Sequence, residues 1–396
     1  MNWSLKNTLT ISGKLLLTAL VALLVIDWAA GRLLAGRLTS NNKGQSQVAL
    51  FPAPYVMYAT RPGSMANTSN IKINAQGFRH PVPVTLTRAR PRVFINGASF
   101  AFGAGATDDS TCYVEQLRKR FPTIEFVIAA GGGGFTAIQE WINLYLNILP
   151  LEPDGIILVD GFTDIALPLY FGENPGNPFQ WQINYSYMTG RPFDILRGYI
   201  LQHSNLCRIW NRLRQDRRAS NPQYCQDIFP KILSIYLYAT SLSYEACQRR
   251  DIPVWHVFHP QLAVGKSQSA EEASFSLPGL NASIRRLYPK MAVALSDLAH
   301  EWRVPCYDMT LSMAGFPGTL YVDYAHLNDN GQAILGDKIA DFLHANSFQE
   351  DVTASYRRRL NHVTHPTNNQ PENGIVFPGL SSFPTQSDAT PRKHDS

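Results

Sequence analysis

A serine stands among small residues in the segment INGASFAFGAG, which covers residues 95 to 105. Ser99 follows a short β-rich run, with Gly97 and Ala98 before it and Gly103 after it. A hydroxyl in this context is expected at the carboxyl end of a strand, where open α/β sheets hold their sites. The segment therefore predicts either a serine nucleophile or a loop that cradles a phosphate.

The phosphate-binding alternative lacks the residues that it needs. A P-loop requires a lysine after its last glycine, and no lysine follows any of these glycines at that spacing. The dinucleotide pattern GxGxxG fails after Gly103, and it fails again after Gly131, because Thr136 stands at the third glycine position. A phosphate at a helix N-terminus remains compatible with the physics, but neither spacing demands it.

An aspartate and a histidine three residues apart supply the partners that a serine nucleophile needs. Asp323 and His326 lie in YVDYAHL, directly before the last helical segment of the α/β pattern. One short loop can hold both, so that the carboxylate orients one imidazole nitrogen while the other nitrogen faces the serine. The alternative is a histidine that caps a helix and an aspartate in a turn. The position of the pair in the strand–helix order favours a triad of Ser99, His326 and Asp323.

The elements that must position these residues alternate between β-rich and helical segments. This alternation is typical of a parallel sheet covered by helices. The β-rich runs are residues 93–95, 125–129, 155–159, 254–258 and, more weakly, 304–307. The helical segments are residues 111–120, 136–149, 232–249, 282–302 and a last helix from about Asn328. We predict one three-layer α/β/α domain over residues 91–345, with a mainly parallel central sheet of about five strands.

The remaining segments are expected to play other parts. Residues 37–90 are predicted to be a polar connector with local order, and residues 170–225, rich in aromatics, proline and arginine, an insertion. The aromatic residues of this insertion form either a cap over the site or a small core of their own. Residues 346–396 are polar and rich in Pro, Asn, Ser and Thr, which predicts a disordered tail.

Residues 1–36 predict a membrane anchor. The uninterrupted apolar run LLLTALVALLVI, from Leu15 to Ile26, is short for a bilayer, but extending it to Leu34 gives the required length of about 20 residues. Asp27 lies toward one end of this segment, where the free-energy cost of placing a charged side chain in the membrane is lower. A cleaved signal peptide is the alternative, and either interpretation exports the rest of the chain. The flanking positive charges are nearly balanced and do not fix the orientation.

Composition excludes several other classes. The formal net charge of +5 is modest and not gathered into a stripe, so no nucleic-acid partner is expected. Five scattered cysteines without a CxxC pair argue against a zinc site or a disulfide framework. One bridge among Cys207, Cys225 and Cys247 and buried free thiols both remain open.

Four motifs in a fixed order resemble the SGNH (GDSL-type) hydrolases, in particular membrane-anchored bacterial members, over residues 72 to 345. They are Gly97-Ala98-Ser99, the glycines from Gly131 to Gly134, Gly161-Phe162-Thr163-Asp164, and Asp323-Tyr324-Ala325-His326. Asn74-Ala75-Gln76-Gly77-Phe78-Arg79 also resembles an upstream stretch of such members. The resemblance implies a flavodoxin-like SGNH fold without metal or organic cofactor.

The resemblance also implies roles for individual residues. The oxyanion hole would take backbone N–H groups of Ser99 and of Gly131, Gly132, Gly133 or Gly134, together with the side chain at Thr163. Thr163 replaces the family's asparagine; loss of one such donor costs about 2.7 to 4 kcal/mol of transition-state stabilisation. We expect Phe100, Phe162 and His259 to line the substrate site, with a structural role as the alternative for His259.

The predicted function is a serine ester hydrolase that acts through an acyl-enzyme. Its substrates would be O-acyl esters, with exported or surface glycans suggested by the resemblance alone, and its domain would lie on the extracytoplasmic side of the membrane. Transfer of the acyl group to a sugar hydroxyl is one alternative. A non-catalytic binding or assembly protein, favoured by Thr163, is the other. The sequence does not determine the oligomeric state.

Overall fold

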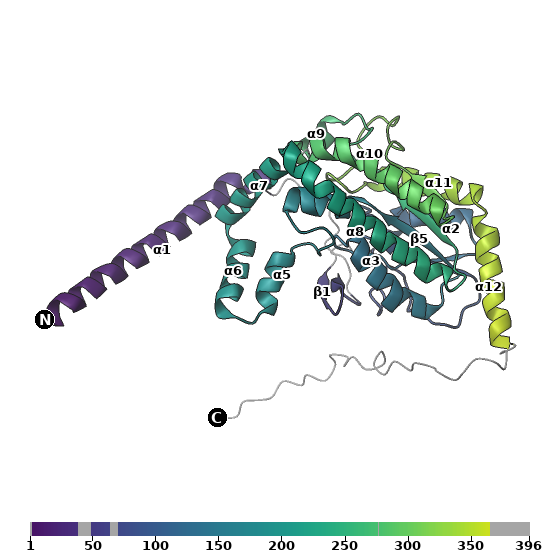
Figure 1. Ribbon diagram of the computed structural model, residues 1–396, viewed down its shortest axis with the longest axis horizontal. Helices are drawn as coiled ribbons and strands as arrows, with labels where there is room; N and C mark the ends of the chain where they lie inside the picture. The colour runs from purple at the N-terminus through teal and green to yellow at the C-terminus, as the bar shows by residue number, and fades with distance from the viewer. Residues whose placement is uncertain (1, 39–48, 64–69, 276, 365–396) are drawn as a thin grey trace, which may run out of the picture. The chain divides into compact units, whose positions relative to one another are not determined.

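The computed structural model describes residues 2–38, 49–63, 70–275 and 277–364 (Figure 1). Parts of the predicted connector and most of the predicted tail, at 39–48, 64–69 and 365–396, lie outside the described residues.

A parallel sheet of five strands forms the centre of the domain. The strands are β3 (Arg92–Gly97), β4 (Glu125–Ile128), β5 (Gly155–Asp160), β6 (Val254–Phe258) and β7 (Cys306–Asp308). Their spatial order is β4-β3-β5-β6-β7, and every neighbouring pair is parallel. Numbered within the sheet this order is 2-1-3-4-5, the flavodoxin-like arrangement. The predicted fold class is confirmed.

Helices cover both faces of the sheet, and the alternation of strand side chains decides which face each helix meets. On one face Ile95 and Val257 pack with α2 (Val114–Arg120), α11 (Asp329–Ala345) and α12 (Phe348–Thr364). On the other, Phe94 and Leu158 pack with α8 (Pro222–Gln248), α10 (Pro278–Glu301) and the π-helical turn Leu144–Ile148 that continues α3 (Ala137–Asn143). The central strands are buried throughout, as expected for a parallel sheet between two helical layers.

The predicted insertion consists of helices. After β5 come α4 (Phe162–Ala166) and a π-helical turn, Leu167–Phe171, and then α5 (Trp181–Met188), α6 (Pro192–His203) and α7 (Asn205–Ser220). Helix α8 begins at Pro222, ten residues before the predicted start, because proline suits a first turn and the Asn221 side chain accepts hydrogen bonds from the N–H groups of Gln223 and Tyr224. A short helix, α9 (Ala270–Ser274), precedes α10.

The segment predicted to be a connector contains a β-hairpin. Strands β1 (Leu50–Ala53) and β2 (Met57–Thr60) pair antiparallel. Val56 and Tyr58 are buried against Ala98 and Phe135, so the hairpin packs on the loops that follow β3 and β4.

The predicted disordered tail is wrong in its first part. Residues Phe348–Thr364 form α12, and Phe348 and Val352 are fully buried. The ring of Phe348 packs against Phe121 and Phe126, with ring centroids 4.9 and 5.9 Å apart. The segment is polar on average, but its two apolar residues Phe348 and Val352 stand four apart and therefore lie on the same side of the helix, which packs on the domain.

Helix α1 (Asn2–Leu38) contains the predicted anchor. Its segment Lys14–Arg32 has a mean hydropathy of 1.9, is not buried, and is long and apolar enough to cross a membrane. Among the described helices of 18 residues or more, no other passes this test.

Candidate active site

Three side chains from two distant loops form a hydrogen-bonded chain. Ser99 lies in the turn after β3, and its Oγ is 2.8 Å from Nε2 of His326, 227 residues away. Nδ1 of the same imidazole is 2.7 Å from Oδ2 of Asp323. Ser99 is half-buried, whereas His326 and Asp323 are buried. The geometry is that of a nucleophile, a base and a carboxylate that orients the base.

The electrostatics of the pair favour a charged imidazole. Burial opposes the charged form of His326, but the adjacent Asp323 carboxylate outweighs it and raises the pKa of His326 above 6.5. Burial also opposes ionisation of Asp323, yet His326 and the backbone N–H groups of Ala325 and His326 lower the pKa of Asp323. Both N–H groups donate to Asp323 Oδ1 at 2.8 Å. An ionised Asp323 can therefore stabilise the imidazolium that forms when Ser99 loses its proton.

A buried ion pair holds the segment that leads into this loop. Nζ of Lys266 lies 2.8 Å from Oε2 of Glu272, and both side chains are buried. The other oxygen of Glu272 accepts hydrogen bonds from the N–H groups of Leu320 and Tyr321, and Lys266 donates to the carbonyl oxygen of Gly318. The chain entering Asp323 is thus held from both sides. No sequence pattern indicates this pair, because neither residue lies near a motif.

The sharp turn that carries Ser99 depends on glycine. Gly97 ends β3 with a φ of 155°, and a Cβ there would lie 2.2 Å from the carbonyl oxygen of Val159 in β5. A Cβ on Gly105, whose φ is 95°, would likewise lie 2.2 Å from the carbonyl oxygen of Leu327. Any larger residue would separate the Ser99 turn from the strand or from the loop of His326.

The side chain of Arg79 also holds the turn that carries Ser99. The stretch singled out in the sequence, Asn74 to Arg79, folds back on itself, and the N–H of Arg79 donates to the carbonyl oxygen of Ile128 at the end of β4. The buried guanidinium then donates to the carbonyl oxygens of Phe102 and Gly103, at 3.0 and 3.1 Å. It also pairs with Asp109 at 2.8 Å. The role of the stretch is therefore to hold the residues that follow Ser99.

The glycine loop after β4 offers fewer oxyanion donors than the sequence predicted. The N–H of Gly131 donates to the carbonyl oxygen of Gly97 at 3.0 Å. The N–H of Gly132 donates to Oγ1 of Thr60 in the β1–β2 hairpin at 3.1 Å. These two N–H groups already have acceptors, so Gly131 and Gly132 are removed from the predicted set. Both N–H groups are used in the hydrogen bonds that close the loop against β3 and the hairpin.

Three backbone donors of the predicted set remain. The N–H groups of Ser99, Gly133 and Gly134 have no acceptor among the described residues. Tyr58 holds the loop in place by donating to the carbonyl oxygen of Gly134 at 3.0 Å. A Cβ on Gly134 would lie 3.5 Å from Cγ2 of Thr163, so these two members of the predicted oxyanion site are neighbours.

Behind this loop lies a buried cluster of carboxyl groups. Asp164 accepts the N–H of Ala137 at the start of α3, at 3.0 Å. Burial and then the charge of Asp160 raise the pKa of Asp164 to about 8. Burial, Asp160 and Asp164 likewise raise the pKa of Glu140. Asp164 therefore connects the turn of Thr163 with the helix after the glycine loop, in surroundings that favour its uncharged form.

Asp160 is the charged member of this cluster. His256 lies 3.0 Å from its Oδ1, and the Tyr236 hydroxyl donates to the same oxygen at 2.6 Å. Burial opposes its ionisation, but His256 and these hydrogen bonds lower the pKa of Asp160. The hydroxyl of Tyr244 lies 2.6 Å from the other ring nitrogen of His256. His256 is therefore part of a closed buried network.

The three residues predicted to line the substrate site come together as an aromatic cluster. The rings of Phe100 and His259 stack with centroids 4.1 Å apart, and Phe162 meets His259 edge-on at 6.2 Å. All three are buried. Burial lowers the pKa of His259 to about 4, so its ring is neutral at ordinary pH. The cluster is packed beside the turn of Ser99 and does not form an exposed surface.

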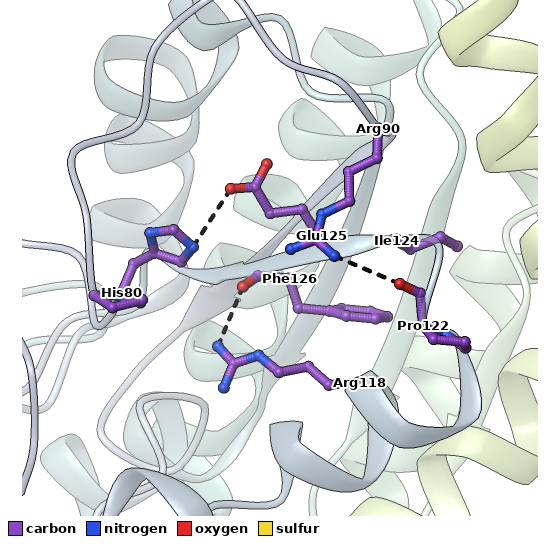
Figure 2. A pocket seen from close by; sticks show the side chains of 8 residues that line it. His80, Arg90, Arg118, Pro122, Ile124, Glu125 and Phe126 are labelled. Atoms are coloured by element: carbon purple, nitrogen blue, oxygen red, sulfur yellow. Dashed lines mark hydrogen bonds and ion pairs between the residues drawn. The ribbon is translucent and has the colours of Figure 1, made fainter.

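A small pocket lies at the amino-terminal end of β4, away from the carboxyl ends of the strands. Figure 2 shows His80, Arg90 and Arg118 around Glu125, the first residue of β4, with His80 Nε2 3.4 Å from the Glu125 carboxylate. Its volume of about 160 Å³ is below the range of roughly 300–1,000 Å³ of ligand sites. The predicted active-site residues follow the carboxyl ends of the strands, so this pocket is not part of that site.

The described residues hold no group of three or more His, Cys, Asp or Glu side chains arranged to bind a metal ion. The five cysteines form no disulfide bond with one another.

The fold and site together define a flavodoxin-like α/β domain with a Ser-His-Asp arrangement at the carboxyl ends of its strands. No protein-family model matches the chain, and no curated protein matches its sequence.

Several solved structures of esterases and lipases resemble the chain at low scores. One is an acetyl xylan esterase, with 14% identity, a TM-score of 0.37, and coverage of 63% of this chain and 97% of the other. An extracellular lipase from Streptomyces rimosus has 12% identity, a TM-score of 0.37, and coverage of 63% and 99%. A lipolytic protein of the G-D-S-L family from Desulfitobacterium hafniense has 12% identity, a TM-score of 0.36, and coverage of 64% and 100%.

Proposed function

We propose that the protein is a membrane-anchored serine ester hydrolase. The observation that carries this proposal is the chain of two short hydrogen bonds from Ser99 through His326 to Asp323. A histidine that only capped a helix would not need a buried carboxylate on one nitrogen and a half-buried serine hydroxyl on the other. Position supports the proposal as well, because Ser99 follows β3 and Thr163 follows β5, the strands at which the order of the sheet reverses.

In the proposed reaction, Ser99 Oγ attacks the ester carbonyl carbon while its proton moves to Nε2 of His326. The electron pair of the C=O bond moves to oxygen, and the N–H groups of Ser99 and of Gly133 or Gly134, with the Thr163 hydroxyl, stabilise this oxyanion. Collapse expels the alcohol, which takes the proton from His326 and leaves an acyl-serine. Water then attacks the acyl carbon while its proton moves to Nε2 of His326. Collapse of this second oxyanion releases the carboxylic acid, and Ser99 Oγ takes the proton back from His326.

The proposal extends to the place and the substrate. The apolar segment of α1 would hold the domain at an extracytoplasmic membrane face, and the substrates would be O-acyl esters, in the first instance O-acetyl groups of glycans. Release of acetate from an O-acetylated polysaccharide by the full chain in nanodiscs tests the substrate. Formation of a new ester on an added oligosaccharide, in place of free acetate, would identify a transferase instead.

A fluorophosphonate probe tests the chemistry directly. Wild-type protein should be labelled and should hydrolyse aryl acetates, and Ser99→Ala should lose both activities. His326→Ala should abolish turnover with the fold intact. Ser241→Ala is a matched control, because this exposed hydroxyl on α8 bonds only its own helix at Tyr238. Absence of labelling at Ser99 together with absence of acetate release would favour a non-catalytic binding protein.

A further inference from the structure

Helices α5 and α6 form a hairpin whose outer face is apolar and exposed. Phe193 is 87% and Met188 70% exposed, and both flank the turn that joins the two helices. Leu196 and Ile200 lie three and seven residues after Phe193, so they continue one side of α6, and both are exposed. These four side chains form an exposed apolar patch on one short helical hairpin.

The opposite side of α6 is the one that packs on α5. Gly198 is the buried residue of α6, and a Cβ there would lie 3.1 Å from Ser186 of α5. The two helices therefore approach closely at Gly198 and Ser186, with Tyr187 beside them, and the exposed apolar side chains of α6 lie on its other side. Figure 1 shows the hairpin projecting from the α/β layers beside the junction of α1 and α7.

The base of the hairpin is tied to the apolar segment of α1. Ser204 ends α6 and caps α7, and its hydroxyl donates to Oδ1 of Asp27 at 2.7 Å. The N–H of Leu206 donates to the same oxygen at 2.9 Å, and Nδ2 of Asn205 donates to the Asp27 carbonyl oxygen at 3.1 Å. These bonds also explain how a carboxylate is accommodated in this segment.

This contact sets the depth of the hairpin. The apolar segment ends at Arg32, five residues after Asp27, which is about 7.5 Å at 1.5 Å per residue. The end of α6 is therefore held within about two helical turns of the point at which α1 would leave a bilayer.

The charges around the hairpin complement an anionic surface. Between residues 181 and 220 the chain has seven arginines and two aspartates. Five of these arginines are exposed, namely Arg191, Arg197, Arg208, Arg214 and Arg217. Trp210 on α7 is also exposed. Exposed apolar side chains with arginine and tryptophan around them are the pattern of helices that lie in a membrane interface.

We infer that the α5–α6 hairpin lies in the headgroup region of the bilayer that α1 spans, with Met188, Phe193, Leu196 and Ile200 at the acyl boundary. The exposed arginines contact anionic lipid headgroups. The domain is thus attached to the membrane twice, once through α1 and once through the hairpin. This inference rests on α1 as the anchor, which is part of the proposed function, and not on the ester chemistry.

Fluorescence of the full chain in lipid nanodiscs tests the inference. A polarity-sensitive fluorescent amino acid is placed at Phe193, and in a matched control at Tyr238, which is 64% exposed on α8. The discs contain phosphatidylcholine and phosphatidylglycerol, and a nitroxide lipid labelled near the top of its acyl chain serves as the quencher. We expect blue-shifted emission and at least twofold quenching at position 193, and neither effect at 238. Equal emission and quenching at both positions would overturn the inference.

Two further arms separate the lipid from other occupants. Phe193→Glu with Leu196→Glu should abolish quenching of a label at Met188 without lowering the melting temperature, since both side chains are exposed. Discs of pure phosphatidylcholine should reduce quenching at position 193 at least twofold, and unchanged quenching would overturn the role of the arginines. A blue shift that needs two chains per disc and shows no lipid quenching would identify a protein interface and overturn the inference.

Ester chemistry serves as an independent readout. The same labelled chain carrying Ser99→Ala should give the same emission and quenching. The Phe193→Glu, Leu196→Glu variant should hydrolyse a soluble aryl acetate at the wild-type rate. Failure of the hairpin inference and failure of the esterase proposal are thus observed separately.

Discussion

The imidazole of His326 lies 2.7 Å from the buried carboxylate of Asp323, and this contact raises the pKa of the histidine. A base works only in its neutral form, so kcat/KM for an aryl acetate should fall as the pH drops through this raised pKa. We expect the acid limb of the profile to lie above 6.5, the ordinary value.

Asp323→Asn provides the control for this profile. Without the carboxylate the acid limb should move to lower pH, because nothing then offsets the effect of burial on His326. The rate at the plateau should fall about 10⁴-fold, because the amide neither holds the reactive tautomer of the imidazole nor stabilises the imidazolium. An unchanged limb in this variant would contradict the assignment of the titrating group to His326.

Thr163 decides the strength of the proposed oxyanion site. Thr163→Val keeps the shape and removes the hydroxyl. If that hydroxyl donates to the oxyanion, kcat should fall about 100-fold or more, which corresponds to about 2.7 kcal/mol. Thr163→Asn should keep kcat or raise it, because its amide can donate from a longer side chain. Equal rates for threonine and valine would show that the backbone N–H groups act without this side chain.

Arg79 should matter for both stability and rate. Arg79→Met leaves the carbonyl oxygen of Phe102 without a donor among the described residues, and the carbonyl oxygen of Gly103 with only the N–H of Ala106. A buried acceptor left unpaired costs about 1–3 kcal/mol, so the variant should have a lower free energy of unfolding and a lower kcat through the displaced Ser99 turn. Chemical denaturation and aryl acetate kinetics measure the two effects. Arg120→Met is the matched control, since its ion pair with Asp341 is exposed and such pairs contribute about 0–1 kcal/mol.

The buried pair of Lys266 and Glu272 should behave differently from a surface pair. Lys266→Met leaves a buried carboxylate without its cation, and removal of one partner of such a pair costs about 3–5 kcal/mol. We expect a loss of this order in urea unfolding. Arg249→Met, which breaks the exposed pair with Glu245, should change stability by less than about 1 kcal/mol. Similar effects of the two substitutions would contradict the structural role of Lys266.

The sequence by itself determined the class of the fold and the candidate triad. β-rich and helical periodicity depend on residues close together in the chain, so the alternation that predicts a parallel sheet is visible without coordinates. The triad was accessible for a related reason. Both of its halves, Ser99 and the pair Asp323 and His326, occur as local motifs at element ends, where α/β sheets collect functional side chains.

Only the tertiary structure decided which groups are available to the site. The N–H groups of Gly131 and Gly132 are used in contacts with Gly97 and Thr60, and no local pattern reveals such long-range partners. The helix α12 was missed for the same reason, because the burial of Phe348 depends on the rings of Phe121 and Phe126 more than 200 residues away. Hydrogen-bond satisfaction and burial are properties of the packed chain, whereas periodicity and motif spacing are properties of its local sequence.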